Sequence, residues 1–207
     1  IVVPDDMPTI QWGIEEAKDG DTVLVMPGTY TENLDYYDKS IVVMSLAGPD
    51  STFLSPADPN AVAVNIASGN SEETIFSGFT LSGGSNSHTI FVNNGASPLI
   101  RNNIFCNNLP DGILSFAVIT CWDSVGIPVI ERNIFYENRG KTSVWIMYGK
   151  AYIVNNTFSG NQAAVMCNSG QATAINNIVY GSLGTAMDGS YAELDYICFF
   201  NNEMDFG

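Results

Sequence analysis

The sequence predicts an all-β protein: a right-handed, single-stranded parallel β-helix of about eight coils behind an N-terminal helical cap. Three observations predict it, namely an internal repeat, short strand-like runs within each repeat, and an asparagine that recurs at the same place. The 207 residues are 45% hydrophobic and 11% aromatic, which is enough for one domain with a substantial core. We therefore expect residues 1–207 to form a single domain.

The repeat has the pattern aliphatic-x-x-Asn-x-Phe/Val. Its copies begin at Ile100, Ile130, Ile153 and Ala174. Its asparagines are Asn103, Asn133, Asn156 and Asn177, which lie 30, 23 and 21 residues apart. Repeats of roughly 20 to 30 residues are typical of solenoids. Each copy is rich in Val, Ile, Phe and Thr, is punctuated by Gly and Asn, and lacks a helical period, so each predicts a coil of short strands.

Stacking of the coils explains the asparagines. Equivalent residues of neighbouring coils lie about 4.8 Å apart, a spacing at which side-chain amides hydrogen-bond to one another in a ladder. We expect Asn103, Asn133, Asn156 and Asn177 to form one such ladder. The same stacking predicts an interior column of Phe105, Phe135, Phe158, Val179 and Phe199.

A second strand in each coil is aligned through the turns that follow it. This alignment predicts an inward column of Val92, Cys121, Met147, Cys167 and Met187. Side chains alternate along a strand, so the residues on either side of each member of this column should face outward. They include Ile146 and Ala186, which precede members of the column, and Trp122 and Tyr148, which follow members of it. Cys121 and Cys167 would be separated by a coil and too far apart for a disulfide. We expect free thiols.

The chain start predicts a cap for the first coil. Within the cap region, residues 8–20, we expect a helix from Pro8-Thr9 to Lys18, ended by Gly20-Asp21. Residues 201–207 are too short and polar to cover the last coil, so we expect a further C-terminal domain of the same chain or a partner to cover that end.

The opening of the chain resembles a known family. Pro8-Thr9-Ile10-Gln11, Gly20-Asp21-Thr22-Val23 and Pro27-Gly28-Thr29-Tyr30-x-Glu32-Asn33 resemble the start of pectin-lyase-like right-handed parallel β-helix proteins. With the Asn-x-Phe coils the resemblance covers nearly the whole chain. It implies the fold but no single activity, because lyases, hydrolases, esterases, adhesins and spacers share that fold. The catalytic motifs of pectin methylesterases, alginate-type lyases and polygalacturonases have no counterpart here.

The net charge of the chain limits the classes of partner that we expect. With 22 acidic against 7 basic residues the net charge is −15, so a nucleic-acid backbone would be repelled. No apolar run is long enough for membrane insertion, and the chain shows no signal peptide. The resemblance implies an extracellular or cell-surface protein of bacterial-type secretion, with a polysaccharide as its partner.

Candidate catalytic residues lie in the predicted turns. Asp123, Lys150 and Asp188 follow the second strand of neighbouring coils, and Arg139 belongs to a second group. That second group also contains His88, Asp111 and Lys141. Elimination at a uronate needs a base and a cation, and glycoside hydrolysis needs two carboxylates, so either a polysaccharide lyase or a glycoside hydrolase is compatible with these residue types. The same residues are also ordinary turn formers. Stacked acidic turns would bind calcium, if any cofactor.

The alternative function is binding without catalysis. Trp122 and Tyr148 would form an aromatic platform for pyranose rings, with Asn168 among the neighbouring hydrogen-bonding groups. A third interpretation is a structural stalk or adhesin segment of a larger surface protein. The sequence leaves the three open.

Overall fold

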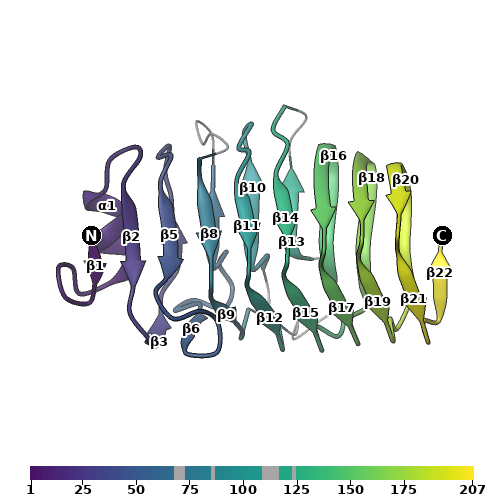
Figure 1. Cartoon of the computed structure of the whole chain (residues 1–207), viewed down its shortest axis with the longest axis horizontal. Coiled ribbons are helices and arrows are strands. Elements are labelled where there is room, and N and C mark those ends of the chain that lie inside the picture. Colours follow the sequence, from purple (N-terminus) through teal and green to yellow (C-terminus); the bar gives the residue numbers. More distant parts are fainter. Residues whose placement is uncertain (68–72, 85–86, 109–116, 123–124) are drawn as a thin grey trace.

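The computed structural model of the 207-residue chain confirms the parallel β-helix (Figure 1). The structure describes residues 1–67, 73–84, 87–108, 117–122 and 125–207. All strand pairs in this part of the chain are parallel, and each strand pairs with its equivalents in the coils before and after it, as in β12 with β9 and β15. The eight strands of one sheet correspond to about eight turns of the solenoid.

That eight-stranded sheet, called sheet B below, forms one side of the solenoid. Its strands in chain order are β3 (Gly28–Thr31), β6 (Thr52–Ser55), β9 (Thr80–Leu81), β12 (Ile104–Cys106), β15 (Ile134–Tyr136), β17 (Thr157–Ser159), β19 (Ile178–Tyr180) and β21 (Cys198–Phe200).

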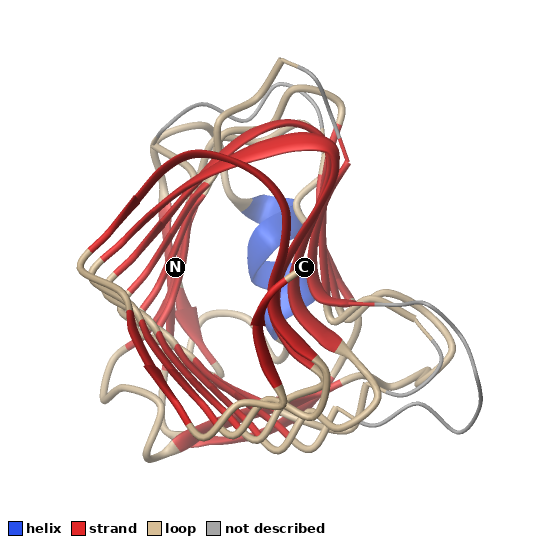
Figure 2. Ribbon diagram, turned by 90° about the vertical axis from the view of Figure 1, so that its right-hand side faces the viewer, coloured by secondary structure: helices blue, strands red, loops and turns tan. Residues whose placement is uncertain are grey.

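The other sheet, sheet A, wraps around the rest of the coil. In the first coils it consists of separate short strands: β1 (Val2–Val3), β2 (Thr22–Val25), β4 (Leu34–Asp35), β5 (Val42–Ser45), β7 (Val64–Ile66), β8 (Ile75–Ser77), β10 (Ile90–Asn93), β11 (Leu99–Arg101), β13 (Ala117–Trp122) and β14 (Val129–Glu131). Later coils replace the short strands by long ones: β16 (Thr142–Val154), β18 (Ala163–Ile175) and β20 (Thr185–Asp195), followed by β22 (Met204–Phe206). Figure 2 shows these strands bending around the coil.

The N-terminal cap is confirmed, with a shorter helix than expected. Helix α1 (Ile10–Glu16) begins after Thr9, whose side chain accepts a hydrogen bond from Trp12 N, and it ends because Ala17 adopts an extended backbone. The expected end at Lys18 is therefore wrong. Ile10 and Ile14 are fully buried against the first coil, and Figure 2 shows α1 across the open end of the solenoid. Among the described residues, no helix has the length and apolar character needed to cross a bilayer.

The asparagine ladder is confirmed. The side-chain Nδ2 of Asn133 donates to Asn156 Oδ1 at 3.2 Å and to Ile100 O at 2.9 Å, while the Asn133 backbone N–H donates to the same Asn156 Oδ1 at 2.9 Å. The links from Asn103 to Asn133 and from Asn156 to Asn177 repeat this pattern. The residue before each ladder asparagine has a left-handed backbone, which makes the tight corner of the coil.

A second ladder forms where the strands of sheet B end, whereas the first lies where they begin. Asn108, Asn138 and Asn161 lie three residues after the aromatic of each repeat, and both Nδ2···Oδ1 links between them are 3.0 Å long. Between the two ladders the predicted interior column is present, with Phe105, Phe135 and Phe158 stacked at 4.8 and 4.9 Å. Each strand of this region is therefore fixed at both ends by buried amides.

The C-terminal residues add a strand that the sequence did not predict. Strand β22 pairs with β20 through Thr185–Met204 and Met187–Phe206. The Phe206 ring lies 4.9 Å from that of Phe199, the last member of the interior column. Residues 201–207 thus begin a further turn of sheet A.

Candidate carbohydrate-binding face

The register of β13 and β16 decides which side chains face outward. Cys121 pairs with Ile146, and Ile146 pairs with Cys167, so fully buried Ile146 occupies the inward place expected for Met147. The next pair is Trp122 with Tyr148, which leaves Met147 as the extra residue of a bulge. The predicted inward Met147 and outward Ile146 are therefore wrong, because alignment from the turns cannot reveal an inserted residue.

The register also shifts in the following coil. Cys167 pairs with Gly189, and Met187 pairs with Val165, one inward position earlier. Met187 is buried as predicted, but it is not the neighbour of Cys167, and Ala186, expected to face outward, is buried. The predicted separation of Cys121 and Cys167 by one coil is confirmed, and all four cysteines are free.

Trp122 and Tyr148 lie on the outer face, as predicted. Each is 45% exposed, and their ring centroids are 5.9 Å apart. The rings meet at 74°, edge to face, and Phe91 continues the row at 6.5 Å from Trp122. The three rings therefore form a stepped row across β10, β13 and β16 rather than one flat platform.

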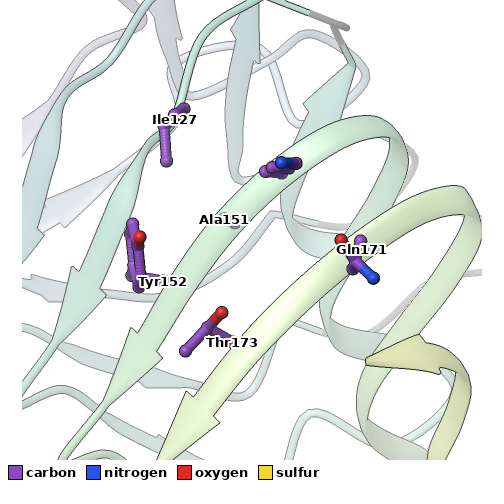
Figure 3. Close-up of a pocket in the computed structure, with 6 residues that line it drawn as sticks. Ile127, Ala151, Tyr152, Gln171 and Thr173 are labelled. Carbon is purple, nitrogen blue, oxygen red and sulfur yellow. The ribbon is translucent and has the colours of Figure 1, made fainter. Parts of the chain in front are cut away.

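A hollow lies farther along β16. Side-chain alternation places Lys150 and Tyr152 on the same outer side as Tyr148, and all three are exposed. The hollow has a volume of about 160 Å³, and its lining consists of Ile127, Lys150, Ala151, Tyr152, Gln171 and Thr173. Figure 3 shows Tyr152 of β16 and Thr173 of β18 side by side among the residues that line it, which agrees with their pairing in the sheet.

Lys150 connects this hollow with a second one. The second has a volume of about 390 Å³ and is lined by Val125, Gly126, Ile127, Gly149, Lys150 and Ser169. Apart from Lys150, the described residues that line the two hollows are uncharged. Sequence reasoning identified Lys150 but missed Tyr152, whose outward position depends on β16 continuing as one strand through the corner of the coil.

The catalytic candidates do not come together in the described part of the chain. Lys150 pairs with Gln171, whereas Asp188 pairs with Met166, the partner of Trp145, five residues before Lys150. Arg139 forms an ion pair with Glu137 in the turn after β15, with Nη2 and Oε2 2.7 Å apart. Asp123 and Asp111 lie outside the described residues.

Asn168 is exposed on β18. It follows Cys167, the partner of Ile146, so by count along the two strands it lies opposite Met147 rather than Tyr148. It is thus near the aromatic row but not at the register position expected for it.

Lys141 is buried, and His88 is partly buried and stacks on Phe91 with ring centroids 5.2 Å apart. Lys141 is fully buried and its Nζ donates to Gly84 O at 2.8 Å and Ser87 O at 2.7 Å, while burial lowers its pKa to about 8. His88 Nδ1 lies 2.7 Å from Thr120 Oγ1. Burial, and then the nearby charge of Lys141, lower the pKa of His88 to about 4. His88 is therefore neutral at pH 7, and Lys141 attaches the segment before β10 through its two hydrogen bonds.

No calcium-type cluster occurs in the part of the chain that the structure describes, where no three His, Cys, Asp or Glu side chains gather to hold a metal ion.

The residues that carry the family resemblance have structural contacts. Both carboxylate oxygens of Glu32 accept backbone N–H groups of α1, from Ile10 at 3.0 Å and Gln11 at 2.9 Å. The Gln11 side chain in turn accepts from Asp35 N at 2.8 Å. These contacts attach the cap to the first coil, so the motif indicates a fold rather than an activity.

Fold and surface together define the class of protein: a parallel β-helix with an N-terminal helical cap and an exposed aromatic face. Comparisons with protein-family models, with curated proteins and with solved structures find no match. The pectin-lyase-like resemblance is thus supported at the level of the β-helix fold.

Proposed function

We propose that this protein binds a polysaccharide on the outer face formed by β13, β16 and β18. One observation carries the proposal: Trp122 and Tyr148, before the corner of the coil at Gly149, and Tyr152, after it, are each close to half exposed, and two hollows that share Ile127 and Lys150 lie at this corner. The extracellular or cell-surface location expected from the sequence is part of this proposal.

The chemistry of the face suits sugars. A pyranose ring has an apolar side that stacks on an aromatic face and hydroxyl groups that need hydrogen-bond partners. Tyr152 supplies the ring beside the smaller hollow, and Gln171, Thr173 and Lys150 supply polar groups around it. The rings of Trp122 and Tyr148 are steeply inclined to each other. They therefore suit a polysaccharide whose successive sugar units turn relative to one another better than one whose sugar units form a flat ribbon.

Binding is better supported than catalysis. A lyase or hydrolase needs a base or a pair of carboxylates at the sugar. Among the described residues that line the two hollows there is no carboxylate or histidine. A lyase or hydrolase activity is therefore the alternative that the experiment below must detect, and a purely structural stalk is the third.

Affinity electrophoresis in gels that contain one polysaccharide each, neutral or uronate-rich, tests the proposal. Trp122→Ala should weaken retention by the responsive polysaccharide about tenfold, because a sugar stacked on a ring contributes about 1–2 kcal/mol. Trp12→Ala is the matched control, since Trp12 on α1 is 51% exposed and far along the chain from the face. Its retention should be unchanged.

Two results would contradict binding at this face: no retention by any polysaccharide, or equal retention of a folded Trp122→Ala variant and wild type. If Trp122→Ala unfolds, Tyr152→Ala replaces it in this test, and retention of Tyr152→Ala equal to that of wild type contradicts the proposal. Absorbance at 235 nm during incubation with uronate polymers would reveal an unsaturated product and thus a lyase, and new reducing ends without this absorbance would reveal a hydrolase.

A further inference from the structure

The outer face of sheet B has a composition unlike the rest of the molecule. Two columns of outward side chains follow its strands from coil to coil. The first column is Thr29, Phe53, Thr80, Ile104, Ile134, Thr157, Ile178 and Cys198. The second is Thr31, Ser55, Cys106, Tyr136, Ser159, Tyr180 and Phe200. We call these residues the sheet B face; its strands lie side by side along the lower edge of Figure 1.

None of these side chains is charged, although the chain carries a net charge of −15. Among the described residues, charged side chains lie where the strands end: Arg132 pairs with Glu131 on one side, and Arg139 pairs with Glu137 on the other. An apolar centre with a charged rim is the anatomy of protein interfaces. The sheet B face is a different surface from the aromatic face on β13 and β16, which belongs to sheet A.

The face also exposes large apolar side chains. Ile134, Ile178, Phe53, Tyr136, Tyr180 and Phe200 are all exposed, and the least exposed of them, Tyr136, is 39% accessible. The four aromatic side chains alone expose on the order of 400 Å² of surface. With the isoleucines, threonines and Cys198 the area approaches the roughly 800 Å² per partner that a standard interface buries.

Ring orientation argues against a sugar on this face. The Tyr180 and Phe200 rings are nearly parallel, at 13°, with centroids 5.7 Å apart. At this distance the rings overlap, so each covers part of the face of the other and presents an edge to solvent. Ring edges and aliphatic groups interdigitate with another sheet, as in two packed β-sheets about 10 Å apart, whereas a pyranose needs a ring face.

We propose that the sheet B face binds the same face of a second copy, forming a dimer with two-fold symmetry. Two copies of this acidic chain repel one another across most of their surfaces. At the sheet B face neither copy brings a charge to be desolvated, and like-charge repulsion is weakest there. A two-fold arrangement also lets both copies bury the same patch, which closes the assembly at two.

Sedimentation velocity of the 207-residue chain over a range of concentrations tests the dimer. Wild type should sediment as a dimer at micromolar concentration. Ile178→Glu should weaken the dimer by at least a hundredfold, because two-fold symmetry places two new carboxylates in one interface. Leu183→Glu is the matched control: it adds the same charge at a similarly exposed residue, 47% against 50%, in the turn after β19. This variant should dimerise like wild type.

Cys198 gives a second measurement, because it is the exposed cysteine of the four and lies on the sheet B face. Its alkylation in the folded protein should slow as wild type is concentrated, and it should not slow for Ile178→Glu. A monomeric wild type would overturn the proposal. This holds also if the monomer binds a polysaccharide or another protein through this face. A dimer that Ile178→Glu and Leu183→Glu leave equally intact would overturn it as well. Melting curves establish that both variants are folded.

Discussion

Asn156, in the middle of the first ladder, connects three coils. The Nδ2 of Asn156 donates to Ile130 O in the coil before and to Asn177 Oδ1 in the coil after. The Oδ1 of Asn156 accepts from the backbone N–H and from the side-chain Nδ2 of Asn133. No other side chain of this size provides two donors and an acceptor in that geometry. The repeat of Asn in the sequence was therefore a sound basis for predicting a ladder.

Replacement of Asn156 by Leu tests the ladder. The variant removes the Oδ1 that accepts the backbone N–H and one side-chain N–H of Asn133, and it removes the Nδ2 that donates to Ile130 O. Asn177 Oδ1 keeps the backbone N–H of residue 156. We therefore expect a loss of about 1–3 kcal/mol in the free energy of unfolding. Urea denaturation measures the loss. Asn168→Leu, at an exposed position on β18, should change stability little. Equal stability of Asn156→Leu and wild type would show that the ladder does not stabilise the fold.

The outward residues were harder to predict than the ladder. Trp122 and Tyr148 were placed correctly, but for a reason that was partly wrong, because the bulge at Met147 moved Ile146 inward. A bulge inserts one residue without a marker in residue type. Sequence alternation alone therefore fixes the outer face only within uninterrupted strands.

At the scale of elements, the cap shows what a local motif encodes. Glu32 lies in the segment between β3 and β4, yet it accepts the first two N–H groups of α1, which have no partner within the helix. Lys39 acts at the other end of α1, where its Nζ donates to Ile14 O at 2.7 Å. The helix position was thus predictable from its own residues, while its attachment depends on residues of the first coil.

Glu32→Gln tests this attachment. The variant replaces one acceptor oxygen by an NH₂ group that faces a backbone N–H, and it removes a negative charge from the helix N-terminus. We expect a loss of about 1–2 kcal/mol in the free energy of unfolding, measured by denaturation. Glu16→Gln, an exposed change on α1, should have almost no effect. If the two variants are equally stable, the cap is fixed by its apolar contacts alone.

The long strands explain why Tyr152 escaped prediction. Gly149 and Gly170 pair with each other in the middle of β16 and β18, where a turn was expected from the glycines. Instead the strands continue through the corner and bring Lys150 and Tyr152 onto the outer surface. Gly149 has a positive φ of 77°, so the corner is made within the strand pairing rather than by a separate loop.

At the scale of the whole molecule, the fold is stabilised by repetition rather than by cross-links. Each coil contacts mainly the coils before and after it, and the buried column and both amide ladders run through several successive coils. The repeat made this architecture predictable from sequence. Some contacts occur only once, such as those of Lys141 with Gly84 and Ser87. They leave no repeated pattern in the sequence, so the sequence alone could not predict them.

The four cysteines test whether any covalent link supplements this repetition. Burial raises the pKa of Cys121 and of Cys167 to about 12, so both thiols are protonated and unreactive in the folded protein. The Ile146 coil separates these two residues, which prevents a disulfide between them. Unfolding in denaturant without reductant should therefore make all four cysteines available to iodoacetamide, with four additions by mass spectrometry. The same count should appear after prior reduction, and reductant should leave the melting temperature unchanged. Two additions without reductant and four with it would reveal a disulfide, and the fold would then owe part of its stability to a cross-link.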